Sequence, residues 1–360
     1  MRASIVCVGE SMTCCETASV PMRSVGPLRF VGPELAEEVF LPLATYETPL
    51  WASVRRGAQV LSSAGGLYVK VLHEGMTRSV LCEAERAEEL VPILAQLDAL
   101  RPEMEAVVAQ TGRFVHLQGL HYECVGNLLF LRWEMTTGEA AGHNMTTKAA
   151  EALLTWLLAR FPALQYVSIS GNLCVDKKVS AINGILKRGK AVVAEALIPS
   201  DLCQKILKTT PVKMTALNIK KNLVGSLLSG GVRSANAHFA NMLLAIYLAT
   251  GQDAANIVEG SQGFTYLETR PEGLYFSINL PNIIVGTIGN GKNLPFVEKN
   301  LQALGCSPSQ GIPGGSARRL AAIVAGAVAC GELSLLAAQT CPGALVAAHM
   351  RLERGVKERS

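Results

Sequence analysis

The chain has 360 residues, enough for two or three domains with sizeable cores, and a formal net charge of +4. Hydrophobic residues make up 49% of it and charged residues 17%, which excludes a disordered chain. The charge is small and no basic stripe with interleaved aromatic residues is present, so the sequence argues against a nucleic-acid partner.

The cysteines and the apolar segments indicate the cellular setting. Ten cysteines are scattered along the chain without a C-x-x-C pair or a histidine at zinc-site spacing. This pattern predicts free thiols in a reducing compartment and no metal site. The N-terminus lacks a signal-peptide core. The most apolar run, from Leu320, meets Glu332 after twelve residues, which predicts a buried core helix rather than a membrane span. We therefore expect a cytoplasmic protein.

The first half of the chain predicts two kinds of segment. Residues 20–50 are rich in proline and predict short strands and turns. Residues 65–82 alternate as a strand does, and this alternation is broken at HEGMTR. Residues 81–168 are more polar and predict a helix, two strands and a helix. We interpret this block as a small α+β domain inserted into a larger one, which residues 1–80 and 169–360 form.

The second half predicts a domain core. KAVVAEALIP predicts a strand. The segment from Ser234 to Val258 is apolar on nearly every side, as is typical of a long helix at the centre of a domain. LYFSINLPNIIVGTIGNGKN predicts a hairpin, and the region from Ser316 is alanine-rich and helical, with a charged tail. The expected fold class is α+β.

Several charged residues lie in apolar sequence. Burial of an unpaired charge is costly, so such residues are either paired or functional. They are Glu47, Asp176 to Lys178, Lys220, Lys221, Asp253 and His349. Each alone also has a structural interpretation, such as a helix cap for Glu47, a surface acid for Asp253 and a solvated side chain near the tail for His349.

Two small-residue loops are candidate anion sites. GTIGNGKN, residues 286–293, follows a strand and can present backbone N–H groups to a phosphate. It lacks the G-x-G-x-x-G spacing of a Rossmann fingerprint. TTGEAAGHNM, residues 136–145, leads into a helix whose N-terminus can receive an anion. Each loop alone is weak evidence for a ligand.

Taken in order, these segments resemble the catalytic domain of hydroxymethylglutaryl-CoA reductase, from about Cys15 to Met350. The matching stretches are PLATYETPLWASVRRG, EGMTR, GRFVHLQGLH, TGEAAGHNM, SGNLCVDKKVSAINGILKRGK, KKNLVGS, NAHFAN, GQDAAN, GTIGNGK, GELSL and HM. The short tail after His349 looks more like the eukaryotic and archaeal form than the other bacterial form. The spacing from Ser334 to His349 is one residue longer than usual.

The resemblance implies a large domain around a long central helix, with an inserted ferredoxin-like domain that receives the nicotinamide cofactor. It also implies a homodimer or homotetramer with active sites between subunits. The implied reaction reduces hydroxymethylglutaryl-CoA to mevalonate and free CoA by two hydride transfers from NADPH, with NADH as the alternative cofactor.

Four residues match the family's catalytic positions. The thioester carbonyl that accepts hydride becomes an oxyanion and needs a fixed cation, which Lys177 matches. The departing CoA thiolate needs a proton near neutral pH, which His349 matches. The aldehyde of the second step needs an acid kept protonated by burial or a neighbouring carboxylate, which Glu47 matches. Asp253 matches the aspartate that tunes Glu47 and Lys177.

The implied binding residues form three groups. Those expected at the substrate's free carboxylate are Arg78, Ser170, Lys221 and Asn241. Guanidinium groups suit the phosphates of CoA, and the segment expected there contains Ser53, Arg55 and Arg56. Those expected at the cofactor are Gly112, Arg113, Glu139, Ala140, Ala141, Gly142 and Asn144. Arg113 matches the position at the cofactor's ribose phosphate, which favours NADPH.

The chain departs from the family pattern at several positions. CETAS (Cys15–Ser19) differs near the dimer contact, and Glu139 and Ala141 differ in the cofactor loop. Asn290 and Lys292 replace a glycine and a threonine in the glycine turn. We expect the turn to survive, because asparagine accepts left-handed conformations better than most residues. Three alternatives stay open: a non-catalytic relative that binds CoA esters, a reductase of another acyl-CoA, and an NADH-dependent enzyme that degrades mevalonate.

Overall fold

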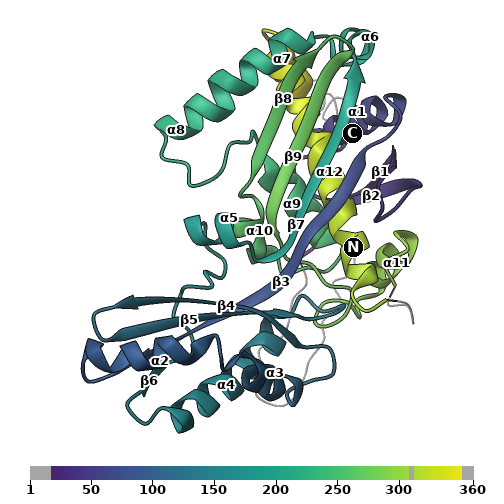
Figure 1. Cartoon of the computed structure of the whole chain (residues 1–360). Coiled ribbons are helices and arrows are strands. Elements are labelled where there is room, and N and C mark those ends of the chain that lie inside the picture. The colour runs from purple at the N-terminus through teal and green to yellow at the C-terminus, as the bar shows by residue number, and fades with distance from the viewer. Residues whose placement is uncertain (1–17, 308–311, 351–360) are drawn as a thin grey trace.

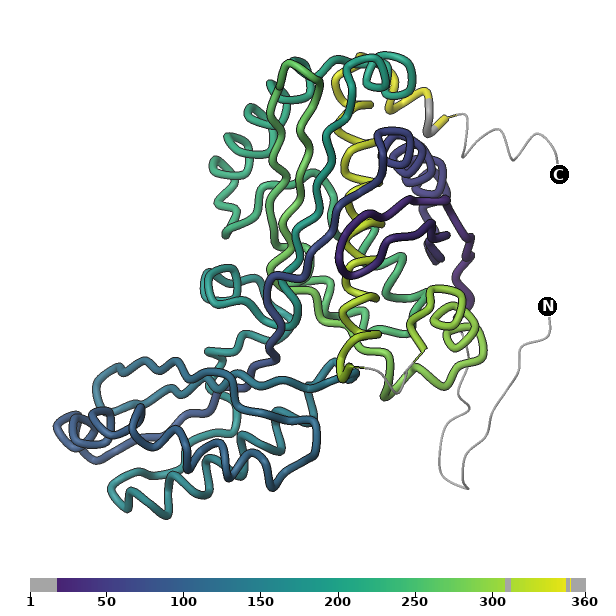
Figure 2. The backbone as a smooth tube through the Cα atoms, turned by 45° about the vertical axis from the view of Figure 1, so that its right-hand side comes forward, coloured from purple at the N-terminus to yellow at the C-terminus, as the bar shows by residue number. Residues whose placement is uncertain are grey.

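The computed structural model describes residues 18–307 and 312–350. Most of the expected CETAS departure and the side chain of His349 lie outside the described residues. Figure 1 shows a larger body above a smaller one, with strand β3 (Tyr68–Glu83) running from one into the other. Figure 2, from a second direction, shows the same separation of the two bodies.

The larger body contains elements from both ends of the chain. Its strands are β1 (Met22–Arg29), β2 (Glu38–Ala44), β7 (Gly189–Pro199), β8 (Phe264–Arg270) and β9 (Gly273–Ile283). Its helical segments are α1 (Pro49–Ser63), α5 (Ala181–Leu186), α6 (Ser200–Leu202), η2 (Cys203–Leu207), α7 (Pro211–Leu217), η3 (Asn218–Gly225), α8 (Ser226–Leu228), α9 (Phe239–Ala249), η4 (Ala254–Asn256), α10 (Ile257–Gly260), α11 (Pro295–Ala303), α12 (Gly315–Gln339) and α13 (Ala344–His349).

The smaller body is formed by the part of the chain that lies between β3 and α5, together with the end of β3. Its elements are η1 (Ala87–Glu89), α2 (Leu90–Leu97), α3 (Arg101–Ala109), β4 (His116–Val125), β5 (Leu128–Thr136), α4 (His143–Arg160) and β6 (Gln165–Ser168). Its own apolar core lies between α2, α3, α4 and the strands, with Trp133 and Leu153 fully buried. The sequence predicted one helix at the start of this block. The structure has two, α2 and α3, and Pro102 lies in the first turn of α3.

Strand β3 is continuous through HEGMTR, where the alternation of the sequence is interrupted. Residues 68–75 pair with β7, and residues 76–83 pair with β5. The register shifts between Val71 and His73, within the half of β3 that pairs with β7. Such a shift changes which face each side chain points to, which explains why the alternation fails although the backbone stays extended. The strand order is β4-β5-β3-β7-β9-β8, with β6 also pairing with β3.

The long buried helix is α12 rather than the segment from Ser234 to Val258, so that prediction is wrong. Within the segment only α9 is a long helix, because the N–H groups of Ala237 and His238 bond to the Glu332 carboxylate before it. Gly251, with φ +63°, follows its end. Helix α12 is long and apolar enough to span a membrane, yet 94% of its most apolar window is buried inside the protein, as predicted for a core helix.

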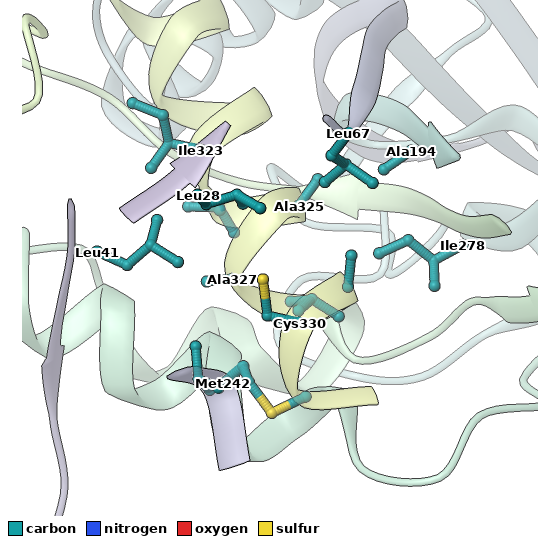
Figure 3. Close-up of a cluster of buried hydrophobic side chains, with 14 of the residues drawn as sticks. Leu28, Leu41, Leu67, Ala194, Met242, Ile278, Ile323, Ala325, Ala327 and Cys330 are labelled. Atoms are coloured by element: carbon teal, nitrogen blue, oxygen red, sulfur yellow. The ribbon is translucent and has the colours of Figure 1, made fainter. Parts of the chain in front are cut away.

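The core of the larger body surrounds α12. Figure 3 shows Ile323, Ala325, Ala327 and Cys330 of this helix among side chains from the strands and α9. LYFSINLPNI forms the single strand β9, so the predicted hairpin within this stretch is wrong. The hairpin instead joins β9 to the preceding β8.

Helix α1 approaches α12 so closely that Gly57 has no room for a side chain. A Cβ added there would lie 2.0 Å from the carbonyl oxygen of Cys330. We expect Gly57→Ala to lower the free energy of unfolding by about 1–3 kcal/mol, because two helix backbones must separate. This outweighs the gain of about 1 kcal/mol that alanine offers within a helix. Denaturant unfolding measures the change.

A matched control is Gly315→Ala at the start of α12, where an added Cβ meets nothing within 4 Å. Only the helix propensity changes there, so we expect stability to stay constant or rise slightly. Equal unfolding curves for the two variants would contradict the close packing of α1 against α12.

Candidate active site

Lys177 lies in the loop between β6 and α5 and is held at both of its ends. Its backbone has φ +55°, and its N–H donates to Glu259 Oε1 at 3.3 Å. Its Nζ lies 2.8 Å from Asp253 Oδ2. Asp253 and Glu259 both belong to the short stretch around η4 and α10, so one segment fixes the backbone and the amine of Lys177.

A buried ion network lies under this loop. Arg188, whose side chain is 2% exposed, reaches Glu259 Oε1 and Asp176 Oδ1, both at 3.0 Å. His143 Nε2 lies 3.5 Å from the same oxygen of Asp176. Burial acts to raise the pKa of Asp176, but His143 and Arg188 together bring it well below its usual range. The network therefore holds an ionised carboxylate next to Lys177.

The Lys177–Asp253 pair is charged at neutral pH. The hydrogen bond to Asp253 raises the pKa of Lys177. Burial acts to raise the pKa of Asp253, but its bonds from Lys177 and the Ala255 N–H outweigh this and lower it. The side chains are 41% and 46% exposed, so the ammonium of Lys177 remains accessible to a ligand. Such a fixed, accessible cation suits an oxyanion.

Glu47 lies in a separate cavity of about 390 Å³ between α1, α9, α12 and α13. Asn241 Nδ2 donates to Glu47 Oε2 at 3.0 Å, and lies 3.4 Å from His238 Nδ1. The Nε2 atom of His238 lies 2.9 Å from the carbonyl oxygen of Gly331. Apolar side chains such as Leu50 complete the lining. The cavity thus combines one acid, one amide and one imidazole with apolar walls.

Two expected CoA-binding residues also line this cavity. Arg56 donates from Nε to Ser334 Oγ at 3.0 Å and from Nη2 to Ser334 O at 2.6 Å. Ser53 Oγ lies 3.0 Å from the same hydroxyl. Burial lowers the pKa of Arg56. Arg55 lies on the exposed side of α1. The guanidinium of Arg56 is therefore positioned by α12 at the cavity wall.

Arg78 reaches the loop after β6, which carries Ser170. Arg78 Nε donates to the carbonyl oxygen of Ile169 at 3.2 Å, and Ser170 is exposed beside it. Lys221, in η3, donates to Asn222 Oδ1 at 3.0 Å. Burial lowers the pKa of Lys221, while the Glu332 carboxylate acts in the opposite direction.

The expected cofactor loop leads directly into α4. Its Gly142 has φ +100° at the N-cap, and no side chain caps this helix of 18 residues. The N–H groups of its first turn thus suit an anion. Gly138 packs toward Phe114, over which the Arg113 guanidinium lies 5.2 Å from the ring centre. The segment with Gly112 and Arg113 therefore lies beside the loop.

The Glu139 side chain joins the cofactor loop to other parts of the fold. Its carboxylate accepts from the N–H groups of Ser316 and Ala317 at 3.1 and 2.8 Å, at the start of α12, and from Thr287 Oγ1 at 2.7 Å. Ala140 pairs with Ile288 in a short bridge. The loop is thus fastened to α12 and to the turn at residues 286–292. Among the described residues, no group of three His, Cys, Asp or Glu side chains is arranged to hold a metal ion.

Comparison with known proteins identifies the family. A family model described as hydroxymethylglutaryl-coenzyme A reductase matches residues 10–354. The 3-hydroxy-3-methylglutaryl-coenzyme A reductase of Pyrococcus abyssi is 45% identical over 324 residues, which cover 89% of this chain and 78% of the relative. The chain belongs to the hydroxymethylglutaryl-CoA reductase family.

Relatives within this reductase family include archaeal and eukaryotic proteins, as the sequence predicted. That of Aeropyrum pernix is 42% identical over 337 residues, covering 93% of this chain and 80% of the relative. Reductase 1 of Oryza sativa subsp. indica is 42% identical over 355 residues, which cover 96% of this chain and 65% of the relative. The class II reductase of Streptococcus pneumoniae, solved bound to NADPH, has the same fold, with a TM-score of 0.72 and 22% identity. The match covers 92% of this chain and 88% of that structure.

In this reductase, the expected residues fall into separate groups. Lys177 and Asp253 pair directly, while Glu47 and Asn241 meet in the cavity. Among the described residues, no hydrogen bond or ion pair joins these two pairs. His349 is the last residue of α13, and its side chain lies outside the described part of the chain.

Sequence reasoning missed the groups that position the Lys177 loop. Glu259 and Arg188 are almost fully buried, and His143 lies within the cofactor loop beside Asp176. Glu259 lies in the apolar run NIVEGSQG, so the criterion of a charge in apolar sequence applies to it as well as to Asp253. Arg188 stands within KRGK, where neighbouring basic residues gave no reason to single it out.

Proposed function

We propose that this chain is a hydroxymethylglutaryl-CoA reductase that forms mevalonate and free CoA by two hydride transfers from NADPH. The observation that carries the proposal is the accessible Lys177–Asp253 pair, at the positions that match the family's catalytic residues. Family membership over residues 10–354 supports the substrate, and the NADPH-bound reductase of similar fold supports the cofactor.

The proposed catalytic roles follow from the contacts. Lys177 places its ammonium at the thioester oxygen and stabilises the oxyanion that forms there. Asp253 orients that ammonium through the 2.8 Å contact. Glu47, held by Asn241, donates the proton to the aldehyde oxygen in the second step. His349 protonates the departing CoA thiolate.

We propose that residues 81–168 form the cofactor domain. The strand order β4-β5-β3-β6 and the two intervening helical segments support a ferredoxin-like arrangement of this domain. The uncapped start of α4 and the adjacent Arg113 fit the phosphates of a dinucleotide, with Ala140 to Asn144 around them. NADPH supplies the hydride when it is bound, and the protein's residues hold it and exclude water.

The substrate is proposed to lie between these groups. Arg78, Ser170 and Lys221 provide cationic and hydroxyl groups for the free carboxylate of the substrate, together with Asn241. The CoA portion fits the cavity of about 390 Å³, whose apolar walls suit a pantetheine chain. Ser53, Arg55 and Arg56 lie on the adjoining helix α1.

We propose a homodimer or a higher oligomer with active sites between subunits. η3 and α8 expose a run of apolar side chains, among them Leu227 at 78% and Leu228 at 84%. A face of this kind is typical of an interface between copies. Light scattering of the wild type and of Leu228→Glu tests this; a wild-type monomer would contradict it.

The assay follows NADPH oxidation, then NADH oxidation, with hydroxymethylglutaryl-CoA, and identifies mevalonate as the product. We expect turnover that is faster with NADPH. No turnover with either cofactor by a folded protein would overturn the proposal and favour a non-catalytic relative. Faster turnover with NADH and mevalonate in reverse would favour the degradative direction. Cell fractionation tests the cytoplasmic location that the cysteine pattern supports.

A further inference from the structure

The turn at residues 286–292 connects two parts of the candidate site. At its start, the Thr287 N–H donates to the carbonyl oxygen of Glu139 at 2.8 Å. A Cβ added to Gly286 would lie 2.3 Å from the N atom of Ala141, so the turn and the cofactor loop are in backbone contact. The Gly286 N–H also donates to Gln252 Oε1 at 2.9 Å. Gln252 directly precedes Asp253 in the chain.

The end of the same turn packs on the segment that carries Asp253. A Cβ added to Gly251 would lie 2.5 Å from the carbonyl oxygen of Gly291, so these backbones also touch. The Nζ atom of Lys292 donates to the carbonyl oxygen of Gly251, which follows the end of α9. A cation is stabilised at the C-terminal end of a helix. Lys292 is therefore the charged contact that fastens the stretch from Gly251 to Asp253.

The charged group that influences Lys292 belongs to the Lys177–Asp253 pair. The Asp253 carboxylate acts electrostatically on Lys292, and Lys177 and His143 act electrostatically on the same carboxylate. Lys177 in turn faces Asp176 and Glu259. Burial lowers the pKa of Lys292 to about 8, with Asp253 acting in the opposite direction. Lys292 thus changes its charge just above neutral pH, whereas Lys177 keeps its charge there.

We propose that Lys292 is a positioning residue for the Lys177–Asp253 pair: its ammonium fastens the Gly251–Asp253 stretch and limits how tightly Asp253 holds Lys177. This rests on the proposed function. When Lys292 is charged, its field weakens the hold of Asp253 on Lys177, and its contact with the Gly251 carbonyl oxygen fixes the Gly251–Asp253 stretch. When Lys292 is neutral, the Asp253 carboxylate is attracted more strongly to Lys177, and that bond holds the Lys177 ammonium more tightly away from the substrate.

Steady-state kinetics across pH, with the chain and NADPH, test the proposal. For the wild type we expect kcat to fall with an apparent pKa near 8, the value for Lys292. Lys292→Met should lose about tenfold in kcat at neutral pH, as a displaced catalytic group does, with little change in the substrate KM. Lys292→Arg keeps its charge, so it should restore kcat and move the alkaline fall to higher pH.

The matched control is Lys299→Met on α11, whose side chain is exposed. It removes one positive charge from a neighbouring element and should leave kcat and its pH dependence unchanged. Identical pH profiles for the wild type, Lys292→Met and Lys292→Arg would overturn the proposal. A stable fold for each variant is checked by thermal unfolding.

A second measurement does not depend on turnover. The rate of Lys177 acylation, followed by mass spectrometry, reports how strongly its amine holds a proton. At neutral pH we expect Lys177 in Lys292→Met to react about threefold more slowly than in the wild type, which is half a pKa unit. Lys292→Arg should react as the wild type does. Equal rates in all three proteins would overturn the role of Lys292, whereas a wild type without turnover would contradict the proposed function alone.

Discussion

Lys177→Ala is expected to lower kcat for NADPH oxidation with hydroxymethylglutaryl-CoA by about 10²–10³-fold or more, the cost of losing a main oxyanion donor. The substitution removes the ammonium that Asp253 orients at 2.8 Å and leaves the backbone contact to Glu259 in place. The loop can therefore keep its course while the cation is lost. Single-turnover measurements of the first hydride transfer check the effect.

The neighbouring Lys178 provides a matched control. Its side chain is exposed and donates only to the carbonyl oxygen of Asp176 within the described residues. We expect Lys178→Ala to change kcat less than about threefold, as an exposed charge in high dielectric does. An unchanged rate in Lys177→Ala would remove Lys177 from the reaction.

The second large effect is expected for Glu47→Gln. The amide keeps an oxygen that accepts from Asn241 Nδ2, so the cavity contact survives, but the acid proton is lost. We expect mevalonate formation to fall by about 10²–10⁴-fold, the usual contribution of a general acid. Release of the CoA thiol, which follows the first hydride transfer, should fall less. Thiol titration and mevalonate analysis of the same reaction separate the two steps.

Glu38→Gln serves as the control for the lost carboxylate, because Glu38 is exposed on β2 and does not line the cavity. It should leave both products unchanged. Equal losses of thiol release and mevalonate in Glu47→Gln would instead place Glu47 at the first step.

Local patterns predicted much of the element order. Pro49 begins α1, and the small-residue loop at 136–145 leads into α4, because proline and glycine restrict the backbone locally. Local patterns were insufficient where tertiary contacts decide. HEGMTR stays extended despite its broken alternation, because β7 and β5 pair with successive halves of β3. The predicted long helix from Ser234 is wrong because Glu332 binds the N–H groups that precede α9.

The candidate site was predicted by residue type but not by arrangement. Glu47, Lys177 and Asp253 can be recognised in the sequence as charged residues within apolar segments, because such residues are rare. The pairing of these side chains is not visible in the sequence. Arg188, Glu259 and Asn241 come from distant segments, and no local pattern indicates which carboxylate or amide each cation or acid will meet.

The amino-acid sequence by itself determined the family and the α+β class and predicted the residues proposed to do the chemistry, since these depend on residue type and order. Only the tertiary structure decided that α12 is the central buried helix and that Lys177 is held by Asp253 and Glu259. It also decided that Lys292 contacts the stretch from Gly251 to Asp253. The reason is that burial and electrostatic pairing depend on distances in space. Packing brings together segments that are far apart in the sequence, and their sequence separation does not indicate that they will be in contact.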